Sequence, residues 1–547
     1  MKFEKFQIST FPVEDIPCSR CAAKNLDCDR KRPRCRKCAK AHSKCHYSGR
    51  QKGRPVAVDL VYPGELRKSP SLPDVQMEAG STAATPNELL NYDLFSSIDE
   101  SSFLFDSFYG PRRSSVEYDP PTDLMSKYSP GASITDDETL KQHYLTNLTG
   151  AFSSKRREWT FYTYIYNHYA SSYDFLRSSI YAWSSADFYF KNKLDNPEDA
   201  YARYLEALRE MADWLAERLK FKQLGTNDVF SLLSTISSNI KEFSDEDLDA
   251  LFSSFYFLAQ FDIVFCRLNE LLHILNCLAK FVRKASTYQL PRGVHARVCS
   301  WLAVLDAKAS LFGNGGGSLS DVLSDIGLFQ TLNASYNVLK REYDLAYPEE
   351  EEQEDTQHFP LLFAFLKLVS LLRDISRYDG INPGSQTLPS TLEELDNMEH
   401  ILNVSNTKPQ SKRVKYTARV VKAMIYTIRI YHRRVLSPTT PPLTFEATEI
   451  IRITEEFMRE TGSPPRTKIW PLPLVLASME VDDNVYLSWA LRNLSDSSMA
   501  DHYQRCGPLI LEVRNREREK DKTANLEEAP MTDIGRLMVE LQGRFVF

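Results

Sequence analysis

Apolar residues recur at helical spacing through most of the chain. After Pro197, one stripe alternates intervals of four and three residues and so lies on one helix face: Tyr201, Leu205, Leu208, Ala212, Leu215 and Leu219. Asn196 and Pro197 supply the N-cap and the first-turn proline expected before such a helix. Similar stripes predict helices near residues 360–376, 414–434, 446–460, 479–495 and 507–520. Because no series of alternating strands emerges, we predict that residues 136–547, the helical region, form a large all-α domain.

The most apolar stretch, Leu251–Phe281, follows a helix-capping sequence at Ser244–Asp247. Four charged residues interrupt it: Asp262, Arg267, Glu270 and Lys280. A helix that spans a bilayer needs about 20 mostly uncharged residues, so we expect buried helix here and no membrane partner. The start of the chain has no apolar run of signal-peptide length, which favours an intracellular protein.

Six of the ten cysteines have a doubled spacing, in which each half is Cys-x2-Cys-x6-Cys and six residues separate the halves: Cys18, Cys21, Cys28, Cys35, Cys38 and Cys45. Thiols this close together form either a disulfide framework or a metal site, and an intracellular chain favours the metal site. The other four cysteines are scattered, as expected of reduced thiols in a core: Cys266, Cys277, Cys299 and Cys506.

The number of thiols limits how zinc can bind. Structural zinc takes four ligands and prefers thiolates, so one zinc ion would leave two cysteines unused, whereas two zinc ions require two shared sulfurs. The symmetry of the repeat leaves three bridging pairs open: Cys18 with Cys35, Cys21 with Cys38, and Cys28 with Cys45. So small a module has almost no apolar core, and we therefore expect zinc to hold it together.

The same segment is strongly basic. Residues 18–54, the zinc module, contain 13 Lys and Arg against Asp27 and Asp29, a net charge of +11, whereas the whole chain is −6 and the remainder is −17. A local basic face on an acidic chain favours binding to duplex DNA. The alternatives are a solvated charged surface or a nuclear-import signal at Arg30–Arg36.

The cysteine spacing, with Asp29 after the third cysteine and Pro33 two residues before the fourth, resembles the binuclear zinc cluster of fungal zinc-cluster transcription factors. The resemblance implies two Zn(II) per chain bridged by Cys18 and Cys35, a nuclear location, and regulation of RNA polymerase II genes. Leu140–Leu145, and Trp470–Leu474 followed by Glu480, are similar to the all-helical fungal-specific regulatory domain of that family. In some members this domain binds a small-molecule effector.

The resemblance also implies two short helices, near residues 20–26 and 37–43, of which the first enters the major groove. Lys24 and Asn25 occupy the positions that contact CGG-type triplets in the family, and Lys suits guanine whereas Asn suits adenine. Because Asn25 and Asp27 interrupt the basic run usual in the family, the sequence leaves the triplet open. We expect contacts to DNA phosphates from Arg20, Arg36, Lys37, Lys40 and Lys44. A basic Gly-rich arm follows, similar to an AT-hook or else a plain linker, with Arg50, Lys52 and Arg54.

Residues 1–17 are expected to form a disordered tail, and the Ser-, Pro- and acid-rich residues 55–135 a disordered linker. Within the linker, residues 87–110 interleave acidic with aromatic and aliphatic side chains and contain no Lys or Arg. Two roles remain open for them: an activation segment that binds the transcription machinery, or a segment that packs onto the helical region. Prolines in residues 55–74 exclude a coiled coil there, so monomer and homodimer both remain open.

Sequence motifs for catalysis are missing. Gly313–Ser318 has the glycines of a phosphate loop but lacks its Lys-Ser/Thr, so we expect a flexible loop. Glu349–Asp355 lacks the spacing of a calcium loop, and we expect a solvated loop. The sequence therefore predicts a transcription regulator rather than an enzyme, with an activator of a metabolic or secondary-metabolite pathway favoured. A metabolite-responsive repressor on the same scaffold is the alternative, and a helical enzyme with an appended zinc module is a remote one.

Overall fold

The computed structural model describes Lys24, Cys38, Lys40 and most of the chain from Thr135 to Phe547. The gaps within that last range are residues 195, 220–228, 237–242, 286–292, 328–331, 333–334, 336, 344–345, 378–388, 406–410, 437–440, 462–468, 496–499 and 524–531. All regular structure in the described part of 136–547 is helical, which confirms the all-α prediction for those residues.

The helices of the first half run as follows: α4 (Asp137–His143), the π-helical η2 (Tyr144–Leu148), α5 (Thr149–Ala151), the 3-10 turn η3 (Arg157–Trp159), α6 (Phe161–Tyr169), α7 (Asp174–Lys191), α8 (Glu198–Arg218), α9 (Val229–Ile236), α10 (Asp245–Val264), α11 (Leu268–Ala285), α12 (Gly293–Ala309), the 3-10 turn η5 (Leu311–Gly313) and α13 (Ser318–Asp325). Those of the second half are α15 (Val338–Tyr343), α16 (Glu349–Ser376), α17 (Pro389–Ser405), α18 (Lys412–Leu436), α19 (Thr444–Thr461), α20 (Leu472–Glu480), α21 (Asn484–Leu494), α22 (Asp501–Thr523) and α23 (Ile534–Leu541).

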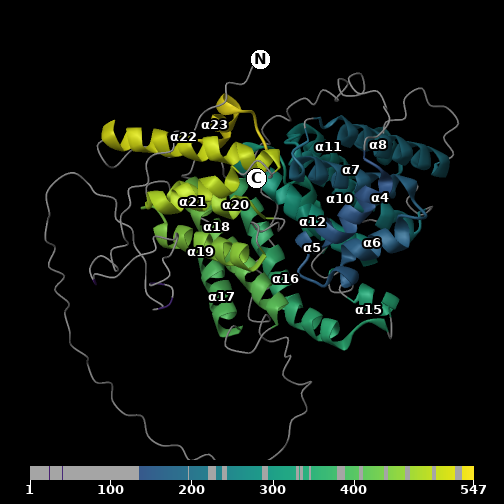
Figure 1. Ribbon diagram of the computed structural model, residues 1–547, viewed down its shortest axis with the longest axis horizontal. Helices are drawn as coiled ribbons and strands as arrows, with labels where there is room; N and C mark the ends of the chain where they lie inside the picture. Colours follow the sequence, from purple (N-terminus) through teal and green to yellow (C-terminus); the bar gives the residue numbers. More distant parts are fainter. Residues whose placement is uncertain are drawn as a thin grey trace, which may run out of the picture. The chain divides into compact units, whose positions relative to one another are not determined.

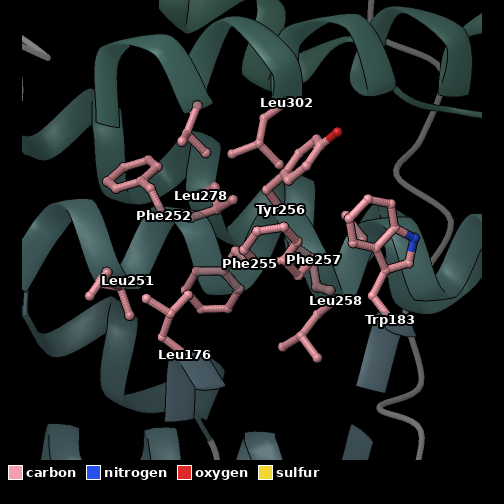
Figure 2. Close-up of a cluster of buried hydrophobic side chains, with 14 of the residues drawn as sticks. Leu176, Trp183, Leu251, Phe252, Phe255, Tyr256, Phe257, Leu258, Leu278 and Leu302 are labelled. Atoms are coloured by element: carbon pink, nitrogen blue, oxygen red, sulfur yellow. The ribbon is translucent and has the colours of Figure 1, made fainter. Parts of the chain in front are cut away.

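Helix α10 forms the centre of the first hydrophobic core. Every residue from Asp247 to Ile263 is buried, because the helix carries apolar side chains on all of its faces and α7, α11 and α12 pack around it. Figure 2 shows Phe255, Tyr256 and Phe257 of α10 among side chains from its neighbours. The Trp183 ring of α7 stacks on Phe257 with centroids 5.5 Å apart.

The apolar stretch Leu251–Phe281 is therefore buried helix, as predicted, but it forms two helices. The chain turns between α10 and α11 at Cys266, where φ is +55°. There the backbone N–H of Arg267 donates to the carbonyl of Asp262 at 2.7 Å. Among the described residues, no helix is long and apolar enough to cross a membrane.

A second hydrophobic core lies among α16, α18, α19, α20 and α22. Helix α12 contributes to both cores: Val298 and Leu302 belong to the first, and Val304 and Ala307 to the second. In Figure 1, α12 accordingly lies between the blue and teal helices of the first core and the green and yellow helices of the second.

Most local helix signals have the predicted effect. Ser244 and Asp247 form a reciprocal capping box at the start of α10, with N–H···O distances of 2.9 and 3.1 Å. Asn196 Oδ1 accepts from the N–H of Glu198 at 2.9 Å, but the N-cap of α8 is Pro197 rather than the predicted Asn196, and the helix begins at Glu198. The buried face of α8, however, is centred one position earlier than the predicted stripe. Its described buried residues are Ala200, Arg203, Tyr204, Ala207, Met211, Ala212 and Leu215.

Two local predictions are wrong. Residues 479–495 are not one helix, because α20 ends at Glu480 and the side chain of Asp483 caps a new helix, α21, by accepting from Val485 N at 2.8 Å. The acidic residues Glu349–Asp355 are not a solvated loop but the first turns of α16, where four glutamates favour the helix N-terminus.

The glycine-rich stretch after α12 also differs from the flexible loop expected. Asn314 is buried and its Nδ2 donates to the carbonyl of Phe545 at 3.1 Å. The buried Asp306 carboxylate accepts from the N–H of Gly317 at 2.9 Å and from the N–H of Ser320 at 2.7 Å. Gly316 lies so close to α12 that an added Cβ would be 2.6 to 2.8 Å from backbone atoms of Asp306 and Ala309. The stretch is therefore a packed turn.

We expect Gly316→Ala to lower the free energy of unfolding by roughly 3 kcal/mol, because the backbone atoms facing the new Cβ cannot move aside as a side chain would. Gly313→Ala is the matched control: φ is +71° there, but nothing lies within 4 Å of the added Cβ. Only conformational strain of about 1 kcal/mol is expected for that variant. Urea unfolding followed by circular dichroism measures both. Equal losses would contradict the close packing at Gly316.

Candidate functional site

The described residues contain three of the positions predicted to form the zinc module. Cys38 and Lys40 have helical backbone, and Cys38 is buried. Lys24 and Lys40 are exposed. The remaining predicted ligands and DNA contacts lie outside the described residues: Cys18, Cys21, Cys28, Cys35, Cys45, Arg20, Asn25, Arg36, Lys37, Lys44, Arg50, Lys52 and Arg54. The tail 1–17, the linker up to residue 134 and its segment 87–110 also lie outside them.

Within the described part of the chain, no group of three or more His, Cys, Asp or Glu side chains could hold a metal ion. The chemistry that the structure does place is a set of buried charged groups in and between the two cores. Each of these groups has to be balanced, because a charge taken out of water without a partner is strongly destabilising.

The first buried set is centred on Glu480, the last residue of the Trp470–Glu480 segment. Its side chain is fully buried at the end of α20 and accepts from Arg433 Nη1 at 2.9 and 2.8 Å. Arg434 Nε lies 2.7 Å from Glu480 Oε1, and the N–H of Leu443 donates to Oε2 at 3.2 Å. One carboxylate thus joins α20 to two consecutive arginines of α18 and to the segment before α19.

Arg514 of α22 binds the same end of α20. Its Nη1 donates to the carbonyls of Ser478 at 3.1 Å and Val481 at 2.6 Å, which satisfies carbonyl groups that a helix end leaves unpaired. Burial lowers the pKa of Arg514 and of Arg433. These contacts make the Trp470–Glu480 segment a structural junction of α18, α20 and α22.

The second buried set lies at the start of α16. Asp355 Oδ2 is 2.9 Å from Lys155 Nζ and accepts from the Tyr347 hydroxyl at 2.5 Å. Its Oδ1 accepts from Arg413 Nη2 at 2.6 Å. Burial raises the pKa of Asp355, but Lys155 and Arg413 outweigh burial and hold the pKa below its ordinary value. Lys155 and Arg413, which are distant in sequence, therefore allow Asp355 to be buried, although the acidic segment was predicted to be solvated.

A third set has the outline of a catalytic arrangement. Asp249 Oδ1 lies 2.6 Å from His295 Nδ1, and Oδ2 accepts from the Tyr169 hydroxyl at 3.0 Å. Cys299 follows His295 by one helical turn on α12. Burial raises the pKa of the Cys299 thiol far above its ordinary value, and the side chain has no exposed surface. A protonated, enclosed thiol is not an activated nucleophile, so this set is structural.

The scattered cysteines agree with their predicted state. Cys266, Cys299 and Cys506 are thiols, and the last two are fully buried. Burial raises the pKa of each. Cys277 Sγ lies 3.9 Å from His273 Nε2.

The fourth set, around Lys308, was missed in the sequence. Lys308 lies on α12 and is 3% exposed, and its Nζ donates to the carbonyl of Trp470 at 3.4 Å. Two side chains of α22 interact electrostatically with it. Lys308 lowers the pKa of His502, and Cys506 acts to raise the pKa of Lys308. A signal did exist, since Asp306 and Lys308 are the only charges in the apolar run Trp301–Phe312.

Breaking the Glu480 junction should be costly. We expect Glu480→Gln to lower the free energy of unfolding by about 3 kcal/mol, because Arg433 and Arg434 lose the buried carboxylate that they share, although Arg434 keeps its contact with Glu517 at 3.1 Å. Glu460→Gln is the matched control: it removes an equally close contact to Arg419, at 2.7 and 2.9 Å, from a side chain that is 54% exposed. That loss should stay within about 1 kcal/mol. Chemical denaturation of both variants measures the difference, and equal losses would refute the role of burial.

Comparison of the chain with known protein families, with curated proteins and with solved structures finds no match. The prediction of a zinc module therefore rests on its own residues: the doubled cysteine spacing and the charge of residues 18–54.

Proposed function

We propose that this chain is a zinc-dependent, sequence-specific DNA-binding protein that regulates transcription by RNA polymerase II in the nucleus. The observation that carries the proposal is the coincidence of six cysteines in a doubled spacing with a net charge of +11 within residues 18–54. Zinc supplies the fold that so short a segment cannot build from apolar residues, and the basic side chains supply affinity for phosphates.

The helical region supports the proposal in a coarser way. It is all-helical where described, as the resemblance to the regulatory domain implies, and its two cores contain the two motifs that the resemblance rests on. Leu140 and Tyr144 are fully buried in the first core, and Trp470 and Leu474 are buried in the second. Between activator and repressor, the acidic and aromatic residues 87–110 favour the activator.

Metal analysis of the full-length protein tests the zinc module directly. We expect two zinc ions per chain, and chelation should release both and abolish DNA binding, because the thiolates are expected to be the main force that holds the module together. Cys35→Ser should lower the zinc content. Cys277→Ser, a thiol of the helical region, should leave it at two. One zinc ion per chain in the unaltered protein would exclude the binuclear cluster.

Two exposed lysines separate specificity from general affinity. We expect Lys24→Ala to relax the sequence preference in an unbiased selection of DNA sites, because this side chain is proposed to contact bases. Lys40→Ala should weaken binding to all sites alike and reduce the slope of log affinity against log salt by about one unit, as expected for one lost phosphate contact. Equal effects of the two substitutions on site preference would contradict these roles. The half-site spacing selected by the unaltered protein would distinguish monomer from homodimer.

A further inference from the structure

A further buried set of charges lies at the turn between α10 and α11. Asp262, near the end of α10, is 1% exposed, and its Oδ1 lies 3.4 Å from Arg267 Nη1. The same guanidinium lies 3.5 Å from Oε1 of Glu270, in the first turn of α11. One cation therefore serves two carboxylates, and this set would have a net charge of −1 if both were ionised.

Asp262 lacks the close cation contacts that balance other buried carboxylates. Glu480 has arginine nitrogens at 2.7 and 2.8 Å, and Asp355 has one at 2.6 Å. By contrast, Asp262 Oδ1 and Arg267 Nη1 have no hydrogen-bond partner among the described residues. The Tyr204 hydroxyl donates to Asp262 Oδ2 at 3.3 Å, which is longer than the usual range of about 2.5–3.0 Å. A buried carboxyl group held this weakly is favoured as the neutral acid.

Aromatic rings hold the guanidinium of Arg267 in place. Its central carbon lies 4.4 Å from the centroid of the Tyr204 ring, 5.6 Å from that of Tyr201 and 5.7 Å from that of Phe261. The faces of aromatic rings attract a cation. The position of Arg267 therefore does not require Asp262 to be ionised.

The backbone of the turn is strained and touches both hydrophobic cores. Cys266 has a φ of +55°, in the left-handed region that is unfavourable for residues other than glycine. It packs against the second core, whereas the buried side chains of α11 belong to the first. The hydrogen bond from the N–H of Arg267 to the carbonyl of Asp262 closes the turn. A charge that appears at Asp262 would thus act on a strained connection.

We propose that Asp262 is a proton-controlled switch, which is a neutral acid while the turn between α10 and α11 is closed and which loosens the turn when it ionises. The switch would make the helical region respond to pH. It goes beyond the proposed DNA-binding function and does not depend on it.

The groups around Asp262 fix the direction of the response. Burial raises the pKa of Asp262 to about 8 against the opposing effect of Arg267, Glu270 adds to the rise, and Tyr204 acts against it. On the side of α22, Asp501 and Arg505 act on the neighbouring Cys266 and pair with each other at 2.8 Å. The ordinary pKa of an aspartate is 3.8, so between these pH values the folded protein binds more protons at this site than the unfolded chain does. The stability that this group contributes therefore falls as the pH rises through that interval.

Urea unfolding of the full-length protein from pH 5 to pH 9 tests the bound proton. Asp262→Asn should fold, because it keeps the shape of the neutral acid while it cannot ionise. The unfolding equilibrium constant of the unaltered protein, divided by that of Asp262→Asn, should rise by up to about tenfold per pH unit and level off above about pH 8. A ratio that stays constant over this range would mean that Asp262 does not titrate there, and would overturn the proposal.

Two further variants test the cause of the response. Glu270→Gln removes the second carboxylate, so Arg267 can balance Asp262 alone, and the ratio should level off at a lower pH. Glu460→Gln is the matched control, because its hydrogen bond to Arg419 lowers the pKa of Glu460 below the ordinary 4.5 and it is ionised throughout the range. This variant should respond to pH as the unaltered protein does. A ratio unchanged by Glu270→Gln would contradict the sharing of one cation by two carboxylates.

Hydrogen exchange of the unaltered protein, followed by mass spectrometry, tests the loosening without any variant. Between pH 7 and pH 9 the amides of residues 264–270 should lose protection beyond the intrinsic rise of exchange with pH. The amides of α18 are the internal reference and should follow the intrinsic rise alone. Equal behaviour of the two segments would show that the turn does not open, and would overturn the switch even if Asp262 binds a proton. Neither measurement bears on zinc content or DNA binding, so the two proposals fail separately.

Discussion

The nearly complete burial of α12 is the constraint on which the rest of the helical region depends. From Val294 to Ala309 every residue except Trp301 is buried, because the helix contributes to both hydrophobic cores. The helix also carries charged and titratable groups, and each of them requires a neighbour inside the protein. His295 meets Asp249 of α10, Asp306 holds the turn before α13, and Lys308 lies against the Trp470 carbonyl. The guanidinium of Arg297 lies over the Phe161 ring at 5.0 Å.

The same principle operates away from α12. Asp355 connects Lys155 and Tyr347 to Arg413 of α18, and Glu480 connects α18 to α20. Buried ion pairs recover only part of the energy lost when their charges leave water, so they contribute less to stability than apolar packing does. Their geometry is directional, however. We infer that they select one arrangement of the helices from the many that apolar contacts alone would permit.

DNA binding is proposed for a short basic segment whose fold is expected to depend on zinc, whereas the buried ion pairs belong to the large helical region. The acidic residues 87–110 lie between the two parts in sequence, and their two open roles correspond to the transcription machinery and to the helical region as binding partners.

Much of the chain's local structure is determined by the sequence alone. The capping box at Ser244 and the apolar character of α10 both act within a few residues, so their effects could be predicted. The six-cysteine spacing likewise depends on neighbouring residues, and for that reason the sequence predicts a zinc module without any tertiary information.

Only the tertiary structure determined which charged residues are buried and which partners they have. From sequence, Glu349–Asp355 was predicted to be solvated. In the fold, Asp355 pairs with Lys155, 200 residues away in sequence, and with Arg413, 58 residues away. The surroundings of Lys308 likewise depend on Trp470, which lies just before α20, and on His502 of α22. Helix periodicity and caps are local and can be predicted from neighbouring residues, whereas the energy of a buried charge depends on partners that only the fold brings together.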